Sequence, residues 1–423
     1  MNLVPAAVLI GLDSMQGLQA ARILHGRGVP VIAFAKDPQH DACRTNVCEE
    51  IRITNTRDDA LVDALLELGR TLAHKAVLYP CEDANVLVVS RNRDILSHYF
   101  HIALPAADVV EMLMDKTRFY AYAHDHGLPI PPTHFLRTRD DLDIACNSLT
   151  FPAILKPANS ATRRWESNCI FSAFKVATTE ELYTLYDGYR AYTDIFILQE
   201  WIEGPDSNLY SCNCYFDEHG QPLATFVSRK LRQWPPHIGK SSLGVECRCD
   251  EVLRETVRLF REVGYRGLGY VEFKLDERYN QYFIVEPNVG RPTGRCTIAE
   301  AGGVELLYTM YCDLVGLALP EGREQRYGTA KWVHLRHDLQ SAAHYWLHGE
   351  LTVREWLRSW RGGPKAFALF SLRDPGPFLS DLWRVTRALL SSAERDRRRW
   401  IVHTDGRSAD PVHSGRRGRL AGQ

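Results

Sequence analysis

The stretch YFIVEPNVGRPTGR, residues 282–295, joins an apolar segment to a polar one. Its first four residues are aromatic or β-branched, which is typical of a strand. The ten residues that follow contain an acid, an amide and two guanidiniums: Glu286, Asn288, Arg291 and Arg295. Charged groups are seldom buried without partners, so this strand end is the first candidate for a functional site.

The segment before this stretch, GLGYVEFKLDERYNQYFIVEPN, predicts an antiparallel hairpin that turns near Tyr279. With that turn Glu272 lies opposite Glu286, and strand alternation places Asn288 on the same face. Facing carboxylates, with Cβ atoms roughly 4.5–5.5 Å apart, repel unless a cation neutralises them. Two carboxylates and an amide favour Mg²⁺ over zinc, with Mn²⁺ as an alternative. The competing interpretation is a solvated sheet face.

The rest of the chain predicts an α/β protein of several lobes, because 423 residues exceed what one core usually holds. Strands and helices alternate at the N-terminus, which predicts a parallel sheet. Antiparallel hairpins dominate later. The predicted organisation is a parallel-sheet domain at 1–107, two α+β lobes at 108–203 and 204–324, the second with the metal site, an α+β extension at 325–400 and a disordered tail at 401–423.

Composition argues against several classes of partner. The chain has 51 Lys and Arg against 52 Asp and Glu, so no net charge favours nucleic acid or an anionic membrane. No apolar run has the length of a membrane span, and the first residues lack the basic region of a signal peptide, so we expect a cytoplasmic protein. The Arg- and Gly-rich end predicts a frayed tail, with a polyanion-binding arm as the less favoured alternative.

Two C-x-C pairs, Cys212/Cys214 and Cys247/Cys249, could supply four thiolates to zinc. Structural zinc sites usually have two to four residues between paired ligands. A C-x-C pair on a strand instead places two small apolar side chains on one face, and this is the favoured interpretation.

Several basic residues lie where a nucleotide could use them. Lys156 ends the apolar strand FPAILKP, so its ammonium must reach a cleft or an anion. Lys116 lies beside Asp115, where a surface ion pair is an equal alternative. A third basic group follows a hairpin strand: Arg229, Lys230, Arg232 and Lys240. Together with a carboxylate metal pair, these cations suit a nucleoside triphosphate.

In this order the motifs resemble the ATP-grasp superfamily, most closely its carboxylate–amine ligases such as the D-alanine:D-alanine ligases and other amino-acid or peptide ligases. The resemblance covers about residues 108–320, and the N-terminal sheet is similar to the domain that precedes the ATP-grasp lobes in such enzymes. LQEWIEGPD, which contains Trp201, looks like their hinge segment. This implies adenine contacts from the backbone of Glu200 and Ile202 and ribose contacts from Asp206.

The resemblance also implies roles for the charged residues. It puts Lys116 and Lys156 on the ATP phosphates and Lys230 near the γ-phosphate. It puts the acids Glu272 and Glu286 on Mg²⁺, together with the amide of Asn288.

Three departures from the family pattern change these expectations. The phosphate-covering loop, usually rich in Gly and Ser, reads ANSATRRWESN with Arg163 and Arg164. The final motif EPNVGRPTGR moves the arginine by one residue. Tyr270 stands where D-alanine ligases have an arginine. We therefore assign Arg291 and Arg295 to the substrate carboxylate or its acyl phosphate, against the alternative of helix capping or surface pairing.

The expected activity is an ATP- and Mg²⁺-dependent ligase that joins a carboxylate to an amine through an acyl phosphate. The substrates would be an amino acid or peptide, and the basic loop suggests an acidic one. Trp165, Trp201 and Trp234 could shape a pocket, although a tryptophan on a strand, as predicted for Trp201, is more often part of the core. The C-terminal extension could cover the site or form a homodimer.

Two other classes of function are weighed against this one. The N-terminal sheet could serve an NAD(P)-dependent oxidoreductase, but the turn from Gly11 to Gly17 lacks the G-x-G-x-x-G pattern. A nucleotide-binding protein without activity is the third hypothesis, and the retained acids and lysines argue against it.

Overall fold

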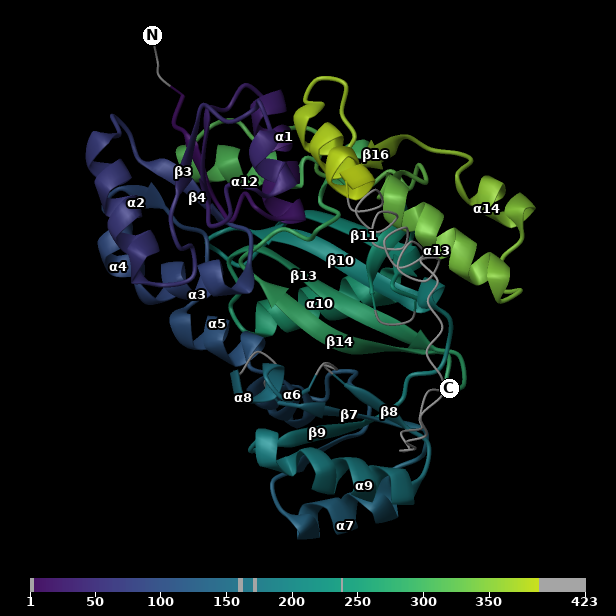
Figure 1. The fold of residues 1–423 in the computed structure, drawn as a ribbon. Helices are drawn as coiled ribbons and strands as arrows, with labels where there is room; N and C mark the ends of the chain where they lie inside the picture. The colour runs from purple at the N-terminus through teal and green to yellow at the C-terminus, as the bar shows by residue number, and fades with distance from the viewer. Residues whose placement is uncertain (1–3, 159–162, 170–172, 237–238, 388–423) are drawn as a thin grey trace, which may run out of the picture. The chain divides into compact units, whose positions relative to one another are not determined.

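The computed structural model describes residues 4–158, 163–169, 173–236 and 239–387 (Figure 1). It divides into two compact units, Met1–Pro377 and Phe378–Gln423. The first unit contains all three sheets of the described chain. The second is helical over residues 378–387, and the predicted tail at 401–423 lies outside the described residues.

The predicted N-terminal parallel sheet is confirmed. Its strands follow the order β3-β2-β1-β4-β5 and are β1 (Ala7–Ile10), β2 (Val31–Ala35), β3 (Glu50–Ile53), β4 (Ala76–Pro80) and β5 (Phe100–His101). The helices of this part are α1 (Met15–Gly26), α2 (Asp59–Thr71), α3 (Asp83–Arg91) and α4 (Arg93–Leu96). Strands β1 and β4 are wholly buried, as expected of a parallel sheet covered on both faces.

The turn between β1 and α1 is explained by packing. The Ser14 side chain caps α1 by accepting the Gly17 N–H at 3.0 Å. A Cβ atom at Gly17 would lie 2.3 Å from the Gly11 carbonyl oxygen. Glycine at this position therefore lets the helix start against the strand end, which requires no bound dinucleotide.

The segment between the parallel sheet and the next lobe is helical with one interruption. The segment forms two helices, α5 (Ala107–Met114) and α6 (Lys116–Asp125). Asp115 interrupts them with an extended backbone, and its side chain accepts the Arg118 N–H at 2.9 Å. Lys116 is consequently the first residue of α6, at the positive end of the helix dipole.

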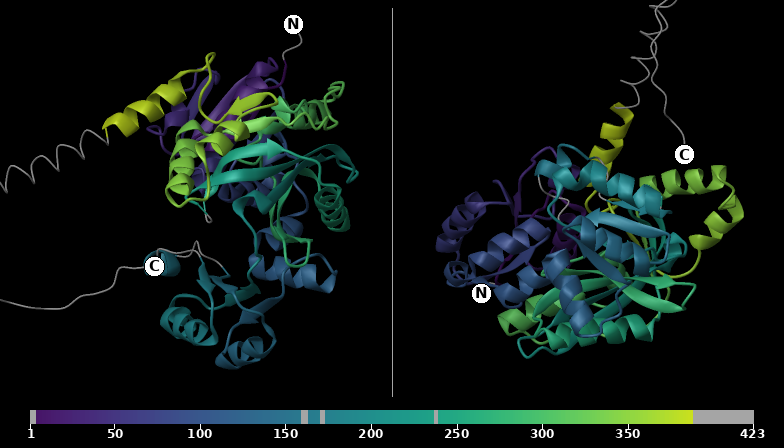
Figure 2. Two further views of the ribbon diagram at one scale, coloured as in Figure 1. Left: turned by 90° about the vertical axis from the view of Figure 1, so that its right-hand side faces the viewer. Right: turned by 90° about the horizontal axis from the view of Figure 1, so that it is seen from below.

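A four-stranded antiparallel sheet follows, in the order β6-β9-β7-β8. The elements of this lobe are β6 (Thr133–Leu136), α7 (Arg139–Ser148), β7 (Ala153–Pro157), α8 (Arg163–Glu166), β8 (Phe174–Val176), α9 (Thr179–Tyr189) and β9 (Phe196–Glu200). Apolar side chains of α7 and α9 pack on one face of the sheet. Figures 1 and 2 show these helices on the side that faces away from the largest sheet.

The largest sheet has seven strands in the order β14-β13-β10-β11-β12-β15-β16. These are β10 (Leu209–Phe216), β11 (Pro222–Trp234), β12 (Lys240–Glu246), β13 (Gly267–Asp276), β14 (Gln281–Val289), β15 (Lys331–Val333) and β16 (Lys365–Phe367). The helices here are α10 (Asp250–Glu262), α11 (Thr297–Ala301), α12 (Leu306–Val315), α13 (Leu335–Leu347) and α14 (Val353–Ser359). Strands β15 and β16 bring residues from beyond position 325 into this sheet.

The two faces of the seven-stranded sheet differ. Cys212 and Cys214 are fully buried and share an apolar cluster with Phe260 of α10, as the non-metal interpretation of these cysteines predicts. Tyr215 and Phe226 of the opposite face pack in the cluster that includes α12. That second face also carries a row of polar residues that includes Ser211, Glu272 and Glu286.

Among the described residues, no helix combines the length and apolarity that a membrane span needs.

Candidate active site

The predicted hairpin of β13 and β14 is confirmed, with Glu272 paired to Glu286. Across the sheet, Glu272 pairs with Ser211, and Ser211 with Ser228. Directly paired residues of an antiparallel sheet share a face. This row therefore places two carboxylates and two hydroxyls side by side. Asn288, two residues beyond Glu286, is on the same face.

The two carboxylates of the pair differ in charge preference. Burial and the nearby Glu272 raise the pKa of Glu286. Burial acts against ionisation of Glu272 as well, but the charges of Lys230, Arg295 and Arg291 lower its pKa. Lys230 Nζ lies 3.8 Å from Glu272 Oε1. One acid is thus held as a carboxylate, while its neighbour requires a further cation to ionise easily.

The donor set fits a hard divalent cation. Asn288 is buried, its Oδ1 accepts from Arg291 Nη2 at 2.6 Å, and its Nδ2 has no partner within the described chain. No group of three His, Cys, Asp or Glu side chains suited to a metal occurs in the described residues. Two carboxylates and one amide oxygen are too few to fill the ligand shell of Mg²⁺. Glu272, Glu286 and the Asn288 oxygen could hold this ion together with water and substrate oxygens. The nearby lysines and arginines suit those phosphate or carboxylate oxygens.

Arg291 is fixed by three neighbours from different elements. Its Nε donates to Asp83 Oδ1 at 2.5 Å and its Nη1 to the Tyr270 hydroxyl at 2.8 Å. The third partner is Asn288. Asp83 is the first residue of α3, so the N-terminal sheet domain helps to aim this guanidinium. The Arg291 Cζ atom lies 5.4 Å from the centre of the Tyr270 ring.

Arg295 crosses the middle of the same face. Its Nη2 donates to Ser211 Oγ at 3.0 Å, and its Nε has no partner in the described part of the chain. A Cβ atom at Gly244 would come within 3.3 Å of Arg295 Cδ, so the glycine leaves room for this side chain. Gln19 of α1 donates to the Gly294 carbonyl at 2.7 Å and holds the loop in place. Arg295 is thus a buried cation with spare donor capacity.

Lys156 extends from β7 toward the acid pair. Its Nζ donates to the Tyr120 hydroxyl at 3.2 Å, and that hydroxyl donates to the Val285 carbonyl at 2.7 Å. Burial lowers the pKa of Lys156 to about 8, and the nearby Glu286 opposes this change. The charge of Lys116 in turn lowers the pKa of Glu286, so both predicted phosphate lysines act at the acid pair.

The low pKa of Lys156 predicts a pH dependence of anion binding. Below about pH 8 its ammonium is charged; as the pH rises through this value, the charge is lost. We expect the dissociation constant for ADP, measured by calorimetry, to rise about tenfold between roughly pH 7 and pH 9.5. Lys156→Arg should remove the dependence, because guanidinium stays charged. A flat profile for the wild-type protein would contradict a phosphate role for Lys156.

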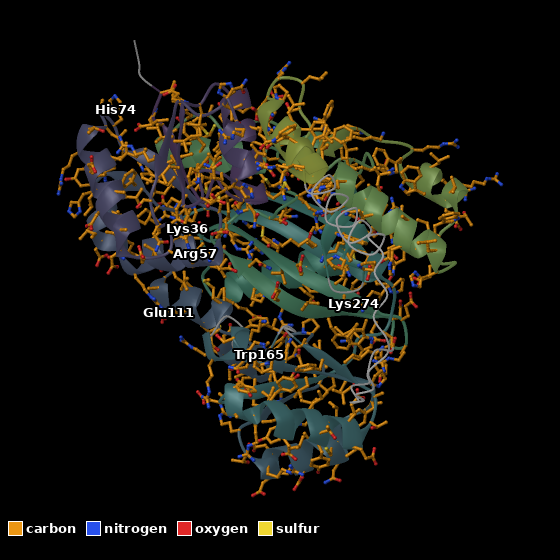
Figure 3. The ribbon with its side chains drawn as sticks, viewed as in Figure 1. Lys36, Arg57, His74, Glu111, Trp165 and Lys274 are labelled. Carbon is orange, nitrogen blue, oxygen red and sulfur yellow. The ribbon has the colours of Figure 1, made fainter. Side chains whose placement is uncertain are left out.

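A cleft of about 660 Å³ adjoins this cluster. Trp201, Asp206, Lys175 and Lys274 line it, and the two lysine Nζ atoms lie 4.4 and 5.0 Å from the Trp201 ring centre. Figure 3 labels Lys274 on the seven-stranded sheet. Trp201 follows β9 and is only partly buried, so the alternative of a core strand residue was wrong. The cleft combines an aromatic wall with an acid and two cations.

The hinge segment is fixed by the turn of the β13–β14 hairpin. Arg278 Nη2 donates to the Trp201 carbonyl at 2.8 Å, and Arg278 Nη1 lies 3.2 Å from Glu200 Oε1. The Tyr279 hydroxyl also donates to Glu200 Oε1 at 3.2 Å. The Glu200 side chain is therefore occupied within the protein. Adenine contacts from the backbone of Glu200 and Ile202 stay a prediction.

Other residues singled out in the sequence lie elsewhere. Trp165 is buried in the core of the four-stranded lobe, so it lines no pocket (Figure 3). Arg164 forms an exposed ion pair with Asp194 at 3.2 Å. The Arg163 side chain and residues 159–162 of the predicted phosphate loop lie outside the described residues. Arg232, grouped above with the phosphate cations, instead forms a buried salt bridge with Asp338 at 2.8 Å.

Comparison with known proteins gives distant relatives. No family model matches the sequence. The chain is 27% identical over 252 residues to the D-aspartate ligase of Enterococcus faecium, a match that covers 55% of this chain and 58% of that protein. It is 24% identical over 219 residues to the D-alanine–D-alanine ligase of Hydrogenovibrio crunogenus, over 49% of this chain and 66% of the relative. The matches thus span less than two thirds of these relatives.

Solved structures share the fold. The biotin carboxylase domain of the 2-oxoglutarate carboxylase from Hydrogenobacter thermophilus, in complex with MgADP, ADP and bicarbonate, superposes with a TM-score of 0.58 at 15% identity. The similarity covers 75% of this chain and 72% of that chain. At this identity the comparison shows the fold alone.

Proposed function

The chain belongs to the ATP-grasp superfamily as a distant relative of amino-acid ligases, and from this we propose that it is an ATP- and Mg²⁺-dependent carboxylate–amine ligase. One observation carries the proposal furthest: the facing pair Glu272 and Glu286 lies within a ring of cations from three parts of the fold. These cations are Lys116, Lys156, Lys230, Arg291 and Arg295. A site made of cations and two carboxylates, without a paired nucleophile and base, suits phosphoryl transfer.

The nucleotide would lie across the cleft and the acid pair. Asp206 would accept from the ribose hydroxyls, while Trp201 and the backbone of Glu200 and Ile202 would surround the base. Lys116 and Lys156 would bind the phosphates. The biotin carboxylase domain with the same fold binds MgADP in its structure, which supports a nucleotide–metal complex as the ligand.

Glu272, Glu286 and Asn288 would hold Mg²⁺, which supplies neutralisation of phosphate charge when bound. The protein's own cations act beside it. Lys230, 3.8 Å from Glu272, would bind the γ-phosphate. Arg291, held by Asp83 and Tyr270, would orient the incoming carboxylate, because its planar donors match carboxylate oxygens.

The reaction then has two steps. A carboxylate oxygen attacks the γ-phosphorus, a new O–P bond forms, and the bond to ADP breaks, which gives an acyl phosphate. An amine next attacks the acyl carbon, and the C–O bond to phosphate breaks to release phosphate and the amide. Arg295, buried with a spare Nε–H, would stabilise the oxyanion of this second step.

The substrate class that we favour is an acidic amino acid as the carboxylate donor. The similarity to a D-aspartate ligase supports this choice.

The proposal predicts that ADP formation requires a pair of substrates. We expect D-aspartate, L-aspartate or the glutamates, offered in turn with amines, amino acids and short peptides, to give ADP release about 100-fold above the ATP-only rate for at least one pair. A coupled ADP assay measures this. The matched control omits one member of the pair. ADP release that is equal with and without every amine would contradict amide formation.

A further inference from the structure

The cleft that holds Asp206 has a wall made by the C-terminal part of the chain. Tyr345 of α13 lines it together with Asp206 and Trp201. The Tyr345 hydroxyl donates to Asp206 Oδ2, and Gln233 Nε2 donates to Asp206 Oδ1 at 2.8 Å. Both carboxylate oxygens thus accept hydrogen bonds from within the protein, and these bonds fix the orientation of the carboxylate.

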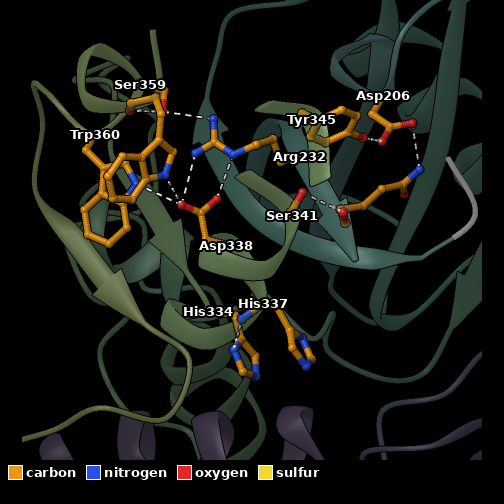
Figure 4. A network of polar contacts seen from close by, with 11 residues as sticks. Asp206, Arg232, His334, His337, Asp338, Ser341, Tyr345, Ser359 and Trp360 are labelled. Carbon is orange, nitrogen blue, oxygen red and sulfur yellow. Dashed lines mark hydrogen bonds and ion pairs between the residues drawn. The ribbon is translucent and has the colours of Figure 1, made fainter. Parts of the chain in front are cut away.

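Helix α13 is anchored to β11 by a buried polar network (Figure 4). Asp338 and Ser341 lie on the helix face that also carries Tyr345. Asp338 accepts from Arg232 Nε at 2.8 Å and from Arg232 Nη2 at 3.1 Å. Ser341 Oγ donates to the Gln233 carbonyl at 2.9 Å. Both helix residues are fully buried, so the position of α13 along the strand is well determined.

Two tryptophans complete the anchor. The indole N–H groups of Trp356 and Trp360 donate to Asp338 Oδ2 at 3.0 and 2.8 Å. Ser359 Oγ accepts from Arg232 Nη1 at 3.0 Å. A buried ion pair with this many hydrogen bonds has its lone pairs and donors satisfied, so removal of one member would be costly. The segment 331–360 is therefore built into the sheet that carries the acid pair.

The Tyr345 hydroxyl is a permanent donor in this arrangement. Burial and then the nearby Asp206 carboxylate raise its pKa well above the ordinary range of tyrosine. The hydroxyl therefore stays protonated at neutral pH.

We propose that the C-terminal extension completes the nucleotide site, with Tyr345 as a positioning residue that orients the Asp206 carboxylate toward the ribose hydroxyls of ATP. This inference rests on the proposed function, since it takes the cleft as the nucleotide site. Asp206 lies in the hinge segment, whereas Tyr345 comes from a segment that the family resemblance, over about residues 108–320, does not include. The extension thus acts in nucleotide selectivity as well as in the fold.

The test compares two nucleotides on two variants of the full chain. Calorimetry in the presence of Mg²⁺ gives dissociation constants for ATP and for 2′,3′-dideoxy-ATP, which lacks the hydroxyls that Asp206 would bind. Tyr345→Phe is expected to weaken ATP binding about fivefold, the value of roughly one hydrogen bond, and to leave dideoxy-ATP binding unchanged. Asp206→Asn is expected to remove most of the preference for ATP, and the double variant should show no further loss.

Tyr311→Phe is the matched control, because this buried hydroxyl donates to the Pro5 carbonyl at 2.5 Å, outside the cleft. It should change neither dissociation constant. Tyr345→Phe with unchanged ATP affinity, or with equal losses for both nucleotides, would overturn the positioning role. A wild-type protein that binds dideoxy-ATP as tightly as ATP would also overturn it. A wild-type protein that binds neither nucleotide would instead overturn the proposed function.

Discussion

Glu286→Gln is expected to lower kcat for the paired-substrate reaction by about 100-fold or more, because it removes one of two carboxylates proposed to hold the metal beside the transferred phosphate. The folded protein should tolerate the change well. The pKa of Glu286 is raised by burial and by Glu272, so its ionised form costs free energy in the folded state. That cost grows as the pH rises from the unfolded pKa through the raised folded pKa.

A neutral glutamine removes this cost. We therefore expect the melting temperature of Glu286→Gln without metal to equal or exceed that of the wild-type protein above about pH 5. Steady-state ADP assays and thermal unfolding measure the two effects separately. Glu262→Gln is the control, since Glu262 ends α10 and pairs with Arg258 at 2.9 Å on the surface. Glu286→Gln turnover within threefold of wild type would contradict the metal assignment.

Arg291→Met is expected to reduce kcat by about 100-fold while it leaves the KM for ATP within about threefold. The reason is that Arg291 is proposed to bind the substrate carboxylate and its acyl phosphate rather than the nucleotide. Asp83, its partner, has a side chain that is 58% exposed, so water can solvate the carboxylate left behind. We therefore expect the variant to lose activity but to keep most of its free energy of unfolding.

Asp83→Asn distinguishes the orientation of the Arg291 guanidinium from its charge. It keeps the guanidinium but weakens the ion pair that orients it, so we expect a smaller fall in kcat, about tenfold, again with little change in the KM for ATP. Arg254→Met is the control, because Arg254 is a largely exposed arginine of α10. If Arg291→Met raised the KM for ATP and spared kcat, Arg291 would belong to the nucleotide site and the assignment would be wrong.

The acid pair was predictable from the sequence because local patterns determine it. Alternation over β13 and β14 and a turn near Tyr279 place Glu272 opposite Glu286, and the observed register agrees. The N-terminal parallel sheet was predictable for the same reason, since continuous apolar runs alternate with amphipathic segments. Roles of individual residues toward ATP and substrate stay predictions.

Contacts between distant segments could not be predicted. The residues that aim the site, Gln19, Asp83 and Tyr345, meet their partners across 275, 208 and 139 positions of the chain. The periodicity of apolar residues along a segment carries no information about such contacts. Strands β15 and β16 have three residues each, too few for an alternation pattern. Strand β12 pairs with β11 through two register shifts, which a simple hairpin pattern does not anticipate.

The same distance explains the wrong interpretation of Arg232. In sequence it belongs to a basic cluster with Lys230, but in the structure its partner Asp338 is 106 positions away. Regular alternation would place Lys230 and Arg232 on one face of β11, but the register shifts on both sides of Arg232. Lys230 therefore lies beside Glu272, while Arg232 pairs with Asp338. Basic residues that are close together in a strand sequence therefore do not all belong to the same site.

The central claim is that a carboxylate is activated by phosphoryl transfer, and oxygen transfer tests it most directly. An active substrate pair is run with the carboxylate labelled by ¹⁸O, and the released phosphate is analysed by mass spectrometry. Because the acyl C–O bond to phosphate breaks in the second step, one labelled oxygen should appear in each phosphate released. Phosphate without label, formed together with the amide product, would contradict the acyl phosphate and with it the proposed function.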